Sequence, residues 1–376
     1  MSHIDELTVR GFRNLHNLTL KNLGQFNLFV GTNNSGKTSV LEAISLYCQP
    51  LDIHKFVSVS RGREGNTSGR IPLVVSIPWM FPTSSTPSSE DTSKERIDIC
   101  GLVKETNIRY IAQFSEVEII DPLAGESHRG NRVSIQSAPG EAIKALKITL
   151  EYEESLGRLS DLGLTTTAEE FVISDYIKIT QPAKKRIPSL LSVQLVTPID
   201  HRTMPLSVRL LSNIISSGDK SKMLHLLKNF DRNIKGIEIL SPDGRNPIPY
   251  FNHDKLGFAP ISVFGDGLRR TITIAAALMQ CRNGVLLIDE LETAIHPQAL
   301  EHVLTWLINA CIQQRVQLFA TTHSLETIDA VISVIKDKLD SLAAYRLDIN
   351  NNRSTARRFS GIHLESIRNE LGQDVR

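Results

Sequence analysis

Residues 31–38 combine residue types and spacing that suit phosphate chemistry. They read GTNNSGKT and fit the pattern G-x-x-x-x-G-K-S/T at every fixed position. A loop of this length curls so that successive backbone N–H groups point inward at phosphate oxygens. Lys37 supplies a positive charge for the β- and γ-phosphates, and Thr38 supplies a hydroxyl for Mg²⁺. The pattern therefore predicts a site for the phosphates of a nucleotide and for Mg²⁺.

The segments on either side of this loop are predicted to hold it in place. Residues 26–30 read as a short apolar strand, and residues 39–48 carry apolar side chains at helical spacing. A helix that begins near Gly36 adds its positive dipole end, and the missing Cβ lets the backbone approach phosphate. Asn34 is expected at positive φ, which asparagine tolerates better than most residues. The residues predicted to bind nucleotide here are Gly31, Thr32, Asn33, Asn34, Ser35, Gly36, Lys37, Thr38 and Ser39.

A second segment places two acids at the end of a buried strand. Residues 284–290 read GVLLIDE, and four consecutive apolar residues are typical of a central strand in a parallel sheet. In enzymes with such a phosphate loop, the first acid supports Mg²⁺ and an adjacent glutamate polarises the attacking water. Asp289 is therefore predicted to support the metal, and Glu290 is predicted to act as the catalytic base.

Two polar turns are further candidates for the same site. Residues 316–324 read as an apolar strand that ends in a polar turn, from which His323 is predicted to reach a γ-phosphate. The alternative is an ordinary helix N-cap region with an exposed, idle histidine. Gly265 and Gly267 flank an aspartate before a helix with apolar spacing, an arrangement suited to an anion. The alternative there is a tight turn before a core helix.

Composition bounds the class of protein. The chain has 376 residues, of which 41% are hydrophobic and 22% charged, with a formal net charge of +1. These are values of a soluble globular protein long enough for two or more domains. No apolar run approaches the roughly 20 residues of a membrane span, no secretory leader is evident, and the four cysteines form no C-x-x-C pair. We expect a cytoplasmic protein with no membrane partner.

The order of segments predicts an α/β fold in which a nucleotide-binding head is interrupted by a long middle region. The head is predicted at 1–50 and 255–376, with a mixed β-sheet and flanking helices. An inserted β-rich and helical region is predicted at 51–254, with mobile loops near 59–95 and 121–143 because these stretches are rich in Ser, Gly and Pro. Individual elements are predicted as a β-meander at 4–30, strands at 96–120, 146–152 and 171–180, and helices from residue 205.

This order of parts resembles the head of ABC-class ATPases, and within them the RecF/SMC/OLD branch of non-transporter ATPases. The similar segments are VRGFRNLHNLTL, GTNNSGKTSVLEAI, GVLLIDELETAIHP and FATTHSLE. The resemblance implies ATP and Mg²⁺ as cofactors, phosphate and Mg²⁺ binding by Lys37 and Thr38, metal support by Asp289, a catalytic base in Glu290 and a γ-phosphate sensor in His323. It also implies an ATP-dependent, head-to-head dimer, in which residues 262–268 touch ATP bound to the second subunit.

The chain departs from the family pattern in three places. Gly265, Asp266 and Gly267 stand where the signature motif usually reads Ser-Gly-Gly. The best candidate for the glutamine loop is Gln113, predicted at a strand end. Only about 50 residues follow His323, which leaves no room for the TOPRIM nuclease domain of OLD nucleases. The chain is thus similar to ATPase-only members such as the ATPase of the PARIS anti-phage system, in which a separately encoded effector acts.

Three functions are consistent with these features. The leading hypothesis is a Mg-ATP hydrolase that dimerises head to head and controls a partner, such as a nuclease or toxin in anti-phage defence. The alternative is a RecF-like DNA repair ATPase, with basic clusters at 184–186 and 357–358 as DNA contacts. A transporter nucleotide-binding subunit is disfavoured by the long middle insertion and by the altered signature motif.

Overall fold

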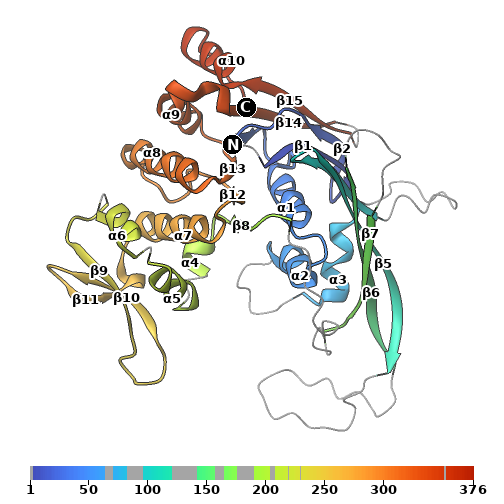
Figure 1. Cartoon of the computed structure of the whole chain (residues 1–376), viewed down its shortest axis with the longest axis horizontal. Coiled ribbons are helices and arrows are strands. Elements are labelled where there is room, and N and C mark those ends of the chain that lie inside the picture. The colour runs from blue at the N-terminus through green and yellow to red at the C-terminus, as the bar shows by residue number, and fades with distance from the viewer. Residues whose placement is uncertain are drawn as a thin grey trace.

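The computed structural model of the chain describes residues 3–63, 71–82, 96–120, 142–156, 165–175, 190–203, 208–218, 220–228, 230–350 and 353–376. These residues form two six-stranded sheets and one three-stranded sheet, with helices packed around them (Figure 1). The α/β class predicted from the sequence is confirmed, as is its mixed β-sheet with flanking helices.

The central sheet carries the phosphate loop and the acidic strand. Its order is β15-β14-β3-β13-β12-β8, and all neighbouring pairs are parallel except β14 and β15. The strands are β3 (Phe26–Val30), β8 (Val193–Val196), β12 (Val285–Ile288), β13 (Gln317–Thr321), β14 (Leu342–Asn350) and β15 (Arg353–Ser360). Every residue of β3, β12 and β13 is buried, because helices cover both faces.

Side chains of alternate residues pack on opposite faces of the central sheet. Phe29 and Phe319 stack at 6.2 Å on the face covered by helix α1 (Lys37–Cys48). Leu28 and Leu318 belong to the core on the other face. That face is covered by α7 (Asp266–Gln280), α8 (Pro297–Gln314), α9 (Leu325–Ile335) and α10 (Gly361–Glu365), as Figure 1 shows.

The second large sheet is antiparallel and has the order β2-β1-β4-β5-β6-β7. Its strands are β1 (Ile4–Phe12), β2 (Leu15–Leu20), β4 (Arg96–Val103), β5 (Thr106–Ile120), β6 (Ala142–Leu156) and β7 (Thr165–Ile173). Helices α1, α2 (Ile53–Arg61) and α3 (Leu73–Ser76) lie between this sheet and the central sheet (Figure 1). The helix that follows the phosphate loop is therefore buried on nearly all sides.

Three sequence predictions are corrected here. The β-meander predicted at 4–30 was wrong for its third strand, because β3 is buried on both faces and pairs with β13 and β14 rather than with β2. The loop predicted near 59–95 was wrong for the end of α2, for α3 and for the turn η1 (Pro78–Met80), where Ile77, Met80 and Phe81 join the core. Residues 64–70, 83–95 and 121–141 of the predicted loops lie outside the described residues, and residues 142–143 were wrongly predicted as loop because they begin β6.

A smaller unit completes the fold beside α7. It contains α4 (Asp200–Thr203), α5 (Val208–Ser216), α6 (Lys220–Lys228), β9 (Ile234–Leu240), β10 (Ile248–His253), β11 (Gly257–Pro260) and the turn η3 (Ile261–Val263). Near the C-terminus lie η4 (Lys336–Ser341) and η5 (Ser366–Glu370). Among the helices of the described residues, none is long and apolar enough to span a membrane.

The predicted division into a head and an insertion stays a prediction. Strand β4, from the predicted insertion at 51–254, pairs with β1 of the predicted head. Strand β8, from the same region, pairs with the acidic strand β12. The middle of the chain therefore contributes strands to both large sheets.

Candidate functional site

The phosphate loop runs from the end of β3 to the start of α1, and its backbone requires special residues. Asn34 has a φ of 63°, which confirms the positive φ expected for it, and Gly36 has a φ of 90°. A Cβ on Gly36 would lie 2.6 Å from the Leu15 side chain. Gly31 has a φ of 141°, and a Cβ there would lie 2.6 Å from the carbonyl oxygen of Leu347. The backbone conformation therefore favours glycine at both positions, and at Gly31 the nearby backbone carbonyl also excludes a Cβ.

The Lys37 ammonium lies inside the curve of this loop. Its Nζ donates to the carbonyl oxygens of Gly31 and Thr32, each at 2.8 Å, and the residue is 6% exposed. Burial lowers the pKa of Lys37, and the carboxylates of the acidic loop oppose that shift. A cation held in this place is suited to phosphate oxygens that enter the loop.

The Asp289 carboxylate accepts hydrogen bonds from two hydroxyl groups that lie in separate parts of the chain. Thr38 Oγ1 donates to Oδ2 at 2.9 Å, and Thr321 Oγ1 donates to Oδ1 at 2.6 Å. The parallel pairing of β12 with β13, and of β13 with β3, brings these three residues to one edge of the sheet. The Thr38 hydroxyl and the Asp289 carboxylate are oxygen ligands of the kind that Mg²⁺ prefers, so the donor set fits this ion.

Glu290 follows Asp289 directly, but its backbone no longer has the extended conformation of a strand. Its φ of 50° lies in the left-handed region, which is uncommon outside glycine and concentrates at functional sites. Its backbone N–H donates to Thr321 Oγ1 at 2.8 Å, and its Oε2 accepts from Thr293 Oγ1 at 2.8 Å. Thr321 therefore holds both acids, a role that sequence reasoning missed.

Arg270 was also missed, although it joins α7 to the acidic loop. The side chain is fully buried at 0% exposure. Its guanidinium donates to the carbonyl oxygens of Asp289 at 2.9 Å and Glu290 at 3.3 Å, and to that of Thr197. Burial lowers the pKa of Arg270, and nearby carboxylates oppose that shift. No local spacing singled it out, because its acceptors lie at the ends of other strands.

The glycine turn begins α7. Gly265 is the N-cap residue with a φ of −61°, and no atom lies within 4 Å of a Cβ built on it. A Cβ on Gly267 would lie 3.0 Å from the carbonyl oxygen of Ala294, in the turn after the acidic strand. The Asp266 carboxylate between them accepts hydrogen bonds from Arg202 and, at 3.3 Å, from Arg269. The hydrogen bond from Arg202 is the main cause that lowers the pKa of Asp266.

His323 lies on the turn between β13 and α9. Its backbone N–H donates to Glu292 Oε1 at 2.9 Å, and its carbonyl oxygen accepts from Arg376 at 3.1 Å. Ser324 caps α9 by accepting from the Thr327 N–H at 3.1 Å, so the N-cap considered in the sequence is present. The turn with His323 is thus tied to the acidic loop through Glu292.

The other predicted residues are placed as follows. Thr32, Asn33 and Asn34 are exposed, whereas Ser35 and Ser39 are buried. The hydroxyl of Ser39 accepts from Arg63 at 2.9 Å. Gln113 was predicted at a strand end, and this was wrong, because it lies in the middle of the long strand β5 and is exposed.

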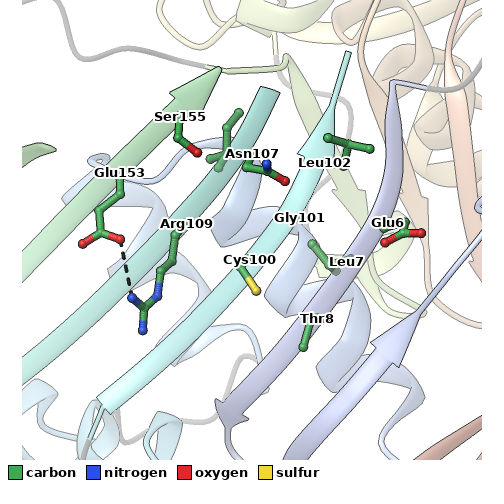
Figure 2. Close-up of a pocket in the computed structure, with 11 residues that line it drawn as sticks. Glu6, Leu7, Thr8, Cys100, Gly101, Leu102, Asn107, Arg109, Glu153 and Ser155 are labelled. Carbon is green, nitrogen blue, oxygen red and sulfur yellow. Dashed lines mark ion pairs between the residues drawn. The ribbon is translucent and has the colours of Figure 1, made fainter. Parts of the chain in front are cut away.

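A separate hollow of about 300 Å³ lies on the second large sheet, over β1, β4, β5 and β6 (Figure 2). Arg109 forms ion pairs in it, with Glu153 at 3.5 Å and with Asp98 at 2.6 Å. Because this arginine is neutralised by neighbours in its own sheet, we assign no ligand to the hollow.

Comparison with solved structures supports the fold. An Smc head domain from Pyrococcus furiosus, solved with an extended coiled coil and bound to the C-terminal domain of ScpA, has a TM-score of 0.50 to this chain. It is 11% identical, and the match covers 99% of this chain and 100% of that one. This likeness shows that the chain has the fold of an Smc head domain.

Comparison with family models identifies the family to which the chain belongs. The family described as "AAA ATPase domain" matches residues 3–243, and "AAA domain, putative AbiEii toxin, Type IV TA system" matches residues 174–329. The first match spans more than half of the chain, so the chain belongs to the AAA ATPase domain family. This membership supports ATP binding and hydrolysis at the general level.

Two curated relatives are similar to the chain. The "ATP/GTP phosphatase" of Helicobacter pylori is 23% identical over 351 residues, which is 89% of each protein. The uncharacterized protein MJECL11 of Methanocaldococcus jannaschii is 34% identical over 114 residues, 30% of this chain and 98% of that protein.

Proposed function

We propose that the protein binds Mg-ATP between the phosphate loop and the acidic loop and hydrolyses it there. The observation that carries this proposal is the 2.9 Å hydrogen bond between Thr38 and Asp289, which lie 251 positions apart. It joins the hydroxyl and the carboxylate that the sequence assigns to Mg²⁺. The buried Lys37 ammonium lies beside them. Thr38 and Asp289 would hold Mg²⁺, which when bound neutralises charge on the β- and γ-phosphates.

The remaining residues of the site suit in-line hydrolysis of the γ-phosphate. Lys37 stabilises the charge that the phosphate oxygens gain in the transition state. Glu290 accepts a proton from the attacking water, and Thr293 orients its carboxylate. His323 donates a hydrogen bond to a γ-phosphate oxygen. The backbone N–H groups of residues 31–39 bind the phosphates, with the N-terminus of α1 behind them.

The proposal extends to a head-to-head dimer that closes on ATP. In it, Gly265 and Gly267 approach the nucleotide of the second subunit. The aspartate between them would repel phosphate, but it is paired with Arg202 and Arg269, which supports this role for the turn. The head at 1–50 and 255–376 forms the dimer, and the region at 51–254 is the surface left for a partner.

We further propose that closure controls a separately encoded effector, a nuclease or a toxin, in the cytoplasm. The family description at residues 174–329 names a toxin of a toxin–antitoxin system. The relative from Helicobacter pylori carries the name of a nucleotide phosphatase. Together with the resemblance to ATPase-only OLD-like proteins, these names favour a nucleotide switch in anti-phage defence.

ATP turnover by the wild type and by Glu290→Gln tests the hydrolytic role. The wild type should release phosphate from Mg-ATP. The variant should bind ATP with unchanged affinity and turn over at least about 100-fold more slowly, because it lacks the base. Glu301→Gln, an exposed change on α8, is the matched control and should match the wild type. A wild type without turnover, or an equally active Glu290→Gln, would contradict the proposal.

A groove between α6 and α8 favours DNA binding as a second candidate function. It has a volume of about 760 Å³, and the described residues that line it include no aspartate or glutamate. Its charged or titratable lining residues are His225, Lys228, Arg232 and His302. Among the described residues, Lys228 and Arg232 form no ion pair. Of the basic clusters noted in the sequence, 357–358 lies exposed on β15, and 184–186 lies outside the described residues.

Fluorescence anisotropy with a labelled DNA duplex at several salt concentrations tests this second candidate. Binding should weaken as salt rises, because phosphate contacts release counterions. The double variant K228E/R232E should bind at least about tenfold more weakly, and Lys336→Glu, an exposed lysine elsewhere, should not. Equal DNA binding by both variants would show that this groove is not the DNA-binding site.

A further inference from the structure

Glu292 is an acid of the nucleotide site that no motif assigns. It lies two positions after Glu290, on the turn that follows β12. Its Oε1 accepts a hydrogen bond from the backbone N–H of His323 at 2.9 Å. The bond links residues 31 positions apart, and it connects the acidic loop to the turn at the end of β13.

This bond is the last of a series that joins the two loops. The Glu290 N–H donates to Thr321 Oγ1 at 2.8 Å, and the Leu291 N–H donates to the Thr321 carbonyl oxygen at 2.9 Å. Both of these bonds use backbone N–H groups of the acidic loop. In the third, a side chain of that loop reaches to the backbone beyond Thr321. The position of His323 relative to Glu290 therefore depends on the Glu292 carboxylate.

The second carboxylate oxygen of Glu292 gives a further reason to assign this side chain a role beyond packing. Glu292 Oε2 is buried, and no described residue offers it a hydrogen bond. A buried acceptor without a donor is costly, so a carboxylate would be a poor choice for a spacer. Its charge also acts on Lys37, together with those of Asp289 and Glu290. The carboxylate thus lies close enough to the phosphate loop to influence the Lys37 ammonium.

We propose that Glu292 is a positioning residue that holds the backbone at His323 so that the imidazole meets the γ-phosphate. The kinetic consequence of this inference rests on the proposed hydrolysis. The hydrogen bond between Glu292 and the His323 N–H does not depend on it. A carboxylate acceptor makes a stronger bond to an N–H group than a neutral acceptor does. Loss of the bond should therefore affect the step in which His323 takes part and leave nucleotide binding nearly intact.

A double-mutant cycle tests the proposal. Glu292→Ala should lower kcat about tenfold and change the affinity for ATP less than about threefold. In the His323→Ala background the same change should cost little, because the residue through which Glu292 acts is gone. Glu292→Gln keeps an oxygen acceptor and should recover kcat to within about threefold of the wild type. If Glu292 acted through its charge on Lys37 instead, the glutamine variant would fail like the alanine variant.

Hydrogen exchange supplies a readout that needs no turnover. The backbone amide of His323 should exchange slowly in the wild type and at least about tenfold faster in Glu292→Ala. Glu301→Ala, on the exposed face of α8, is the control for loss of a carboxylate. An unchanged exchange rate, or additive losses in the cycle, would overturn the proposal. An inactive wild type with the expected exchange would contradict the proposed hydrolysis and leave the contact established.

Discussion

Thr321 holds the two acids of the candidate site with one hydroxyl group. Its Oγ1 donates to Asp289 at 2.6 Å and accepts from the Glu290 N–H at 2.8 Å, and the residue is fully buried. A hydroxyl can do both because it is donor and acceptor at once. An ionised carboxylate could not replace it, because a carboxylate only accepts hydrogen bonds. Its loss should therefore affect stability and turnover together.

Thr321→Val keeps the shape of the side chain and removes the hydroxyl. We expect a loss of about 1–3 kcal/mol in unfolding free energy, since a buried N–H and a carboxylate oxygen lose their partner. We also expect kcat to fall at least about tenfold. Thr321→Ser keeps the hydroxyl and should retain most of the unfolding free energy and most of kcat. Thermal unfolding and phosphate release measure the two effects, and a fully active, equally stable valine variant would show that Asp289 and Glu290 are held by other groups.

Prediction from the sequence succeeded where the local structure depends on local spacing. The phosphate loop is contiguous, so its pattern, its strand and helix, and the positive φ of Asn34 were all accessible. Thr321, Arg270 and Glu292 could not be found in that way. Each acts on a residue between 19 and 32 positions away, and only the pairing of β12 with β13 and the packing of α7 bring them together.

At the scale of elements, Arg270 ties helix α7 to the ends of two strands. Its guanidinium bonds to carbonyl oxygens at the ends of β8 and β12, and α7 begins at the glycine turn. A movement of that turn would thus be transmitted through α7 to Glu290. The planar fork of arginine serves several acceptors at once, which an ammonium group cannot do in the same geometry.

Arg270→Lys should retain the positive charge but lose the planar guanidinium with its several N–H donors. We expect kcat to fall at least about tenfold, because the carbonyl at Glu290 loses its donor, while ATP affinity changes less than about threefold. We also expect the unfolding free energy to fall by about 2 kcal/mol. Arg245→Lys, in the exposed turn between β9 and β10, is the control. A variant with lower stability but normal kcat would limit Arg270 to a structural role.

The elements also show where patterns along the chain mislead. The apolar run of β3 predicted a strand, but a strand buried on both faces can be placed only when its neighbours β13 and β14 are known. The Pro- and Ser-rich composition around residues 71–82 predicted a loop. Four buried residues override it, namely Leu73, Ile77, Met80 and Phe81. Burial of these side chains against the second sheet outweighs weak local propensity.

At the scale of the whole molecule, the glycine turn offers a direct test of the proposed dimer. A Cβ on Gly265 would meet no atom of its own chain within 4 Å, and the φ of −61° is open to any residue. A valine there should leave the fold unchanged and place its methyl groups where the nucleotide of a second subunit would pack. An effect on assembly would therefore report on contact between subunits rather than on folding.

The measurement is the solution mass in the Glu290→Gln background, in which ATP persists. With Mg-ATP, but not with Mg-ADP, the mass should rise from 41.9 kDa to about twice that value. Adding Gly265→Val should keep the protein monomeric. Gly62→Val, at a position with negative φ where the nearest atom to a Cβ lies 3.5 Å away, should not. Dimers that form in spite of the valine would remove the turn from the interface. A double mass in every nucleotide state would place assembly on another surface, and the ATP-dependent closure proposed above would then be wrong.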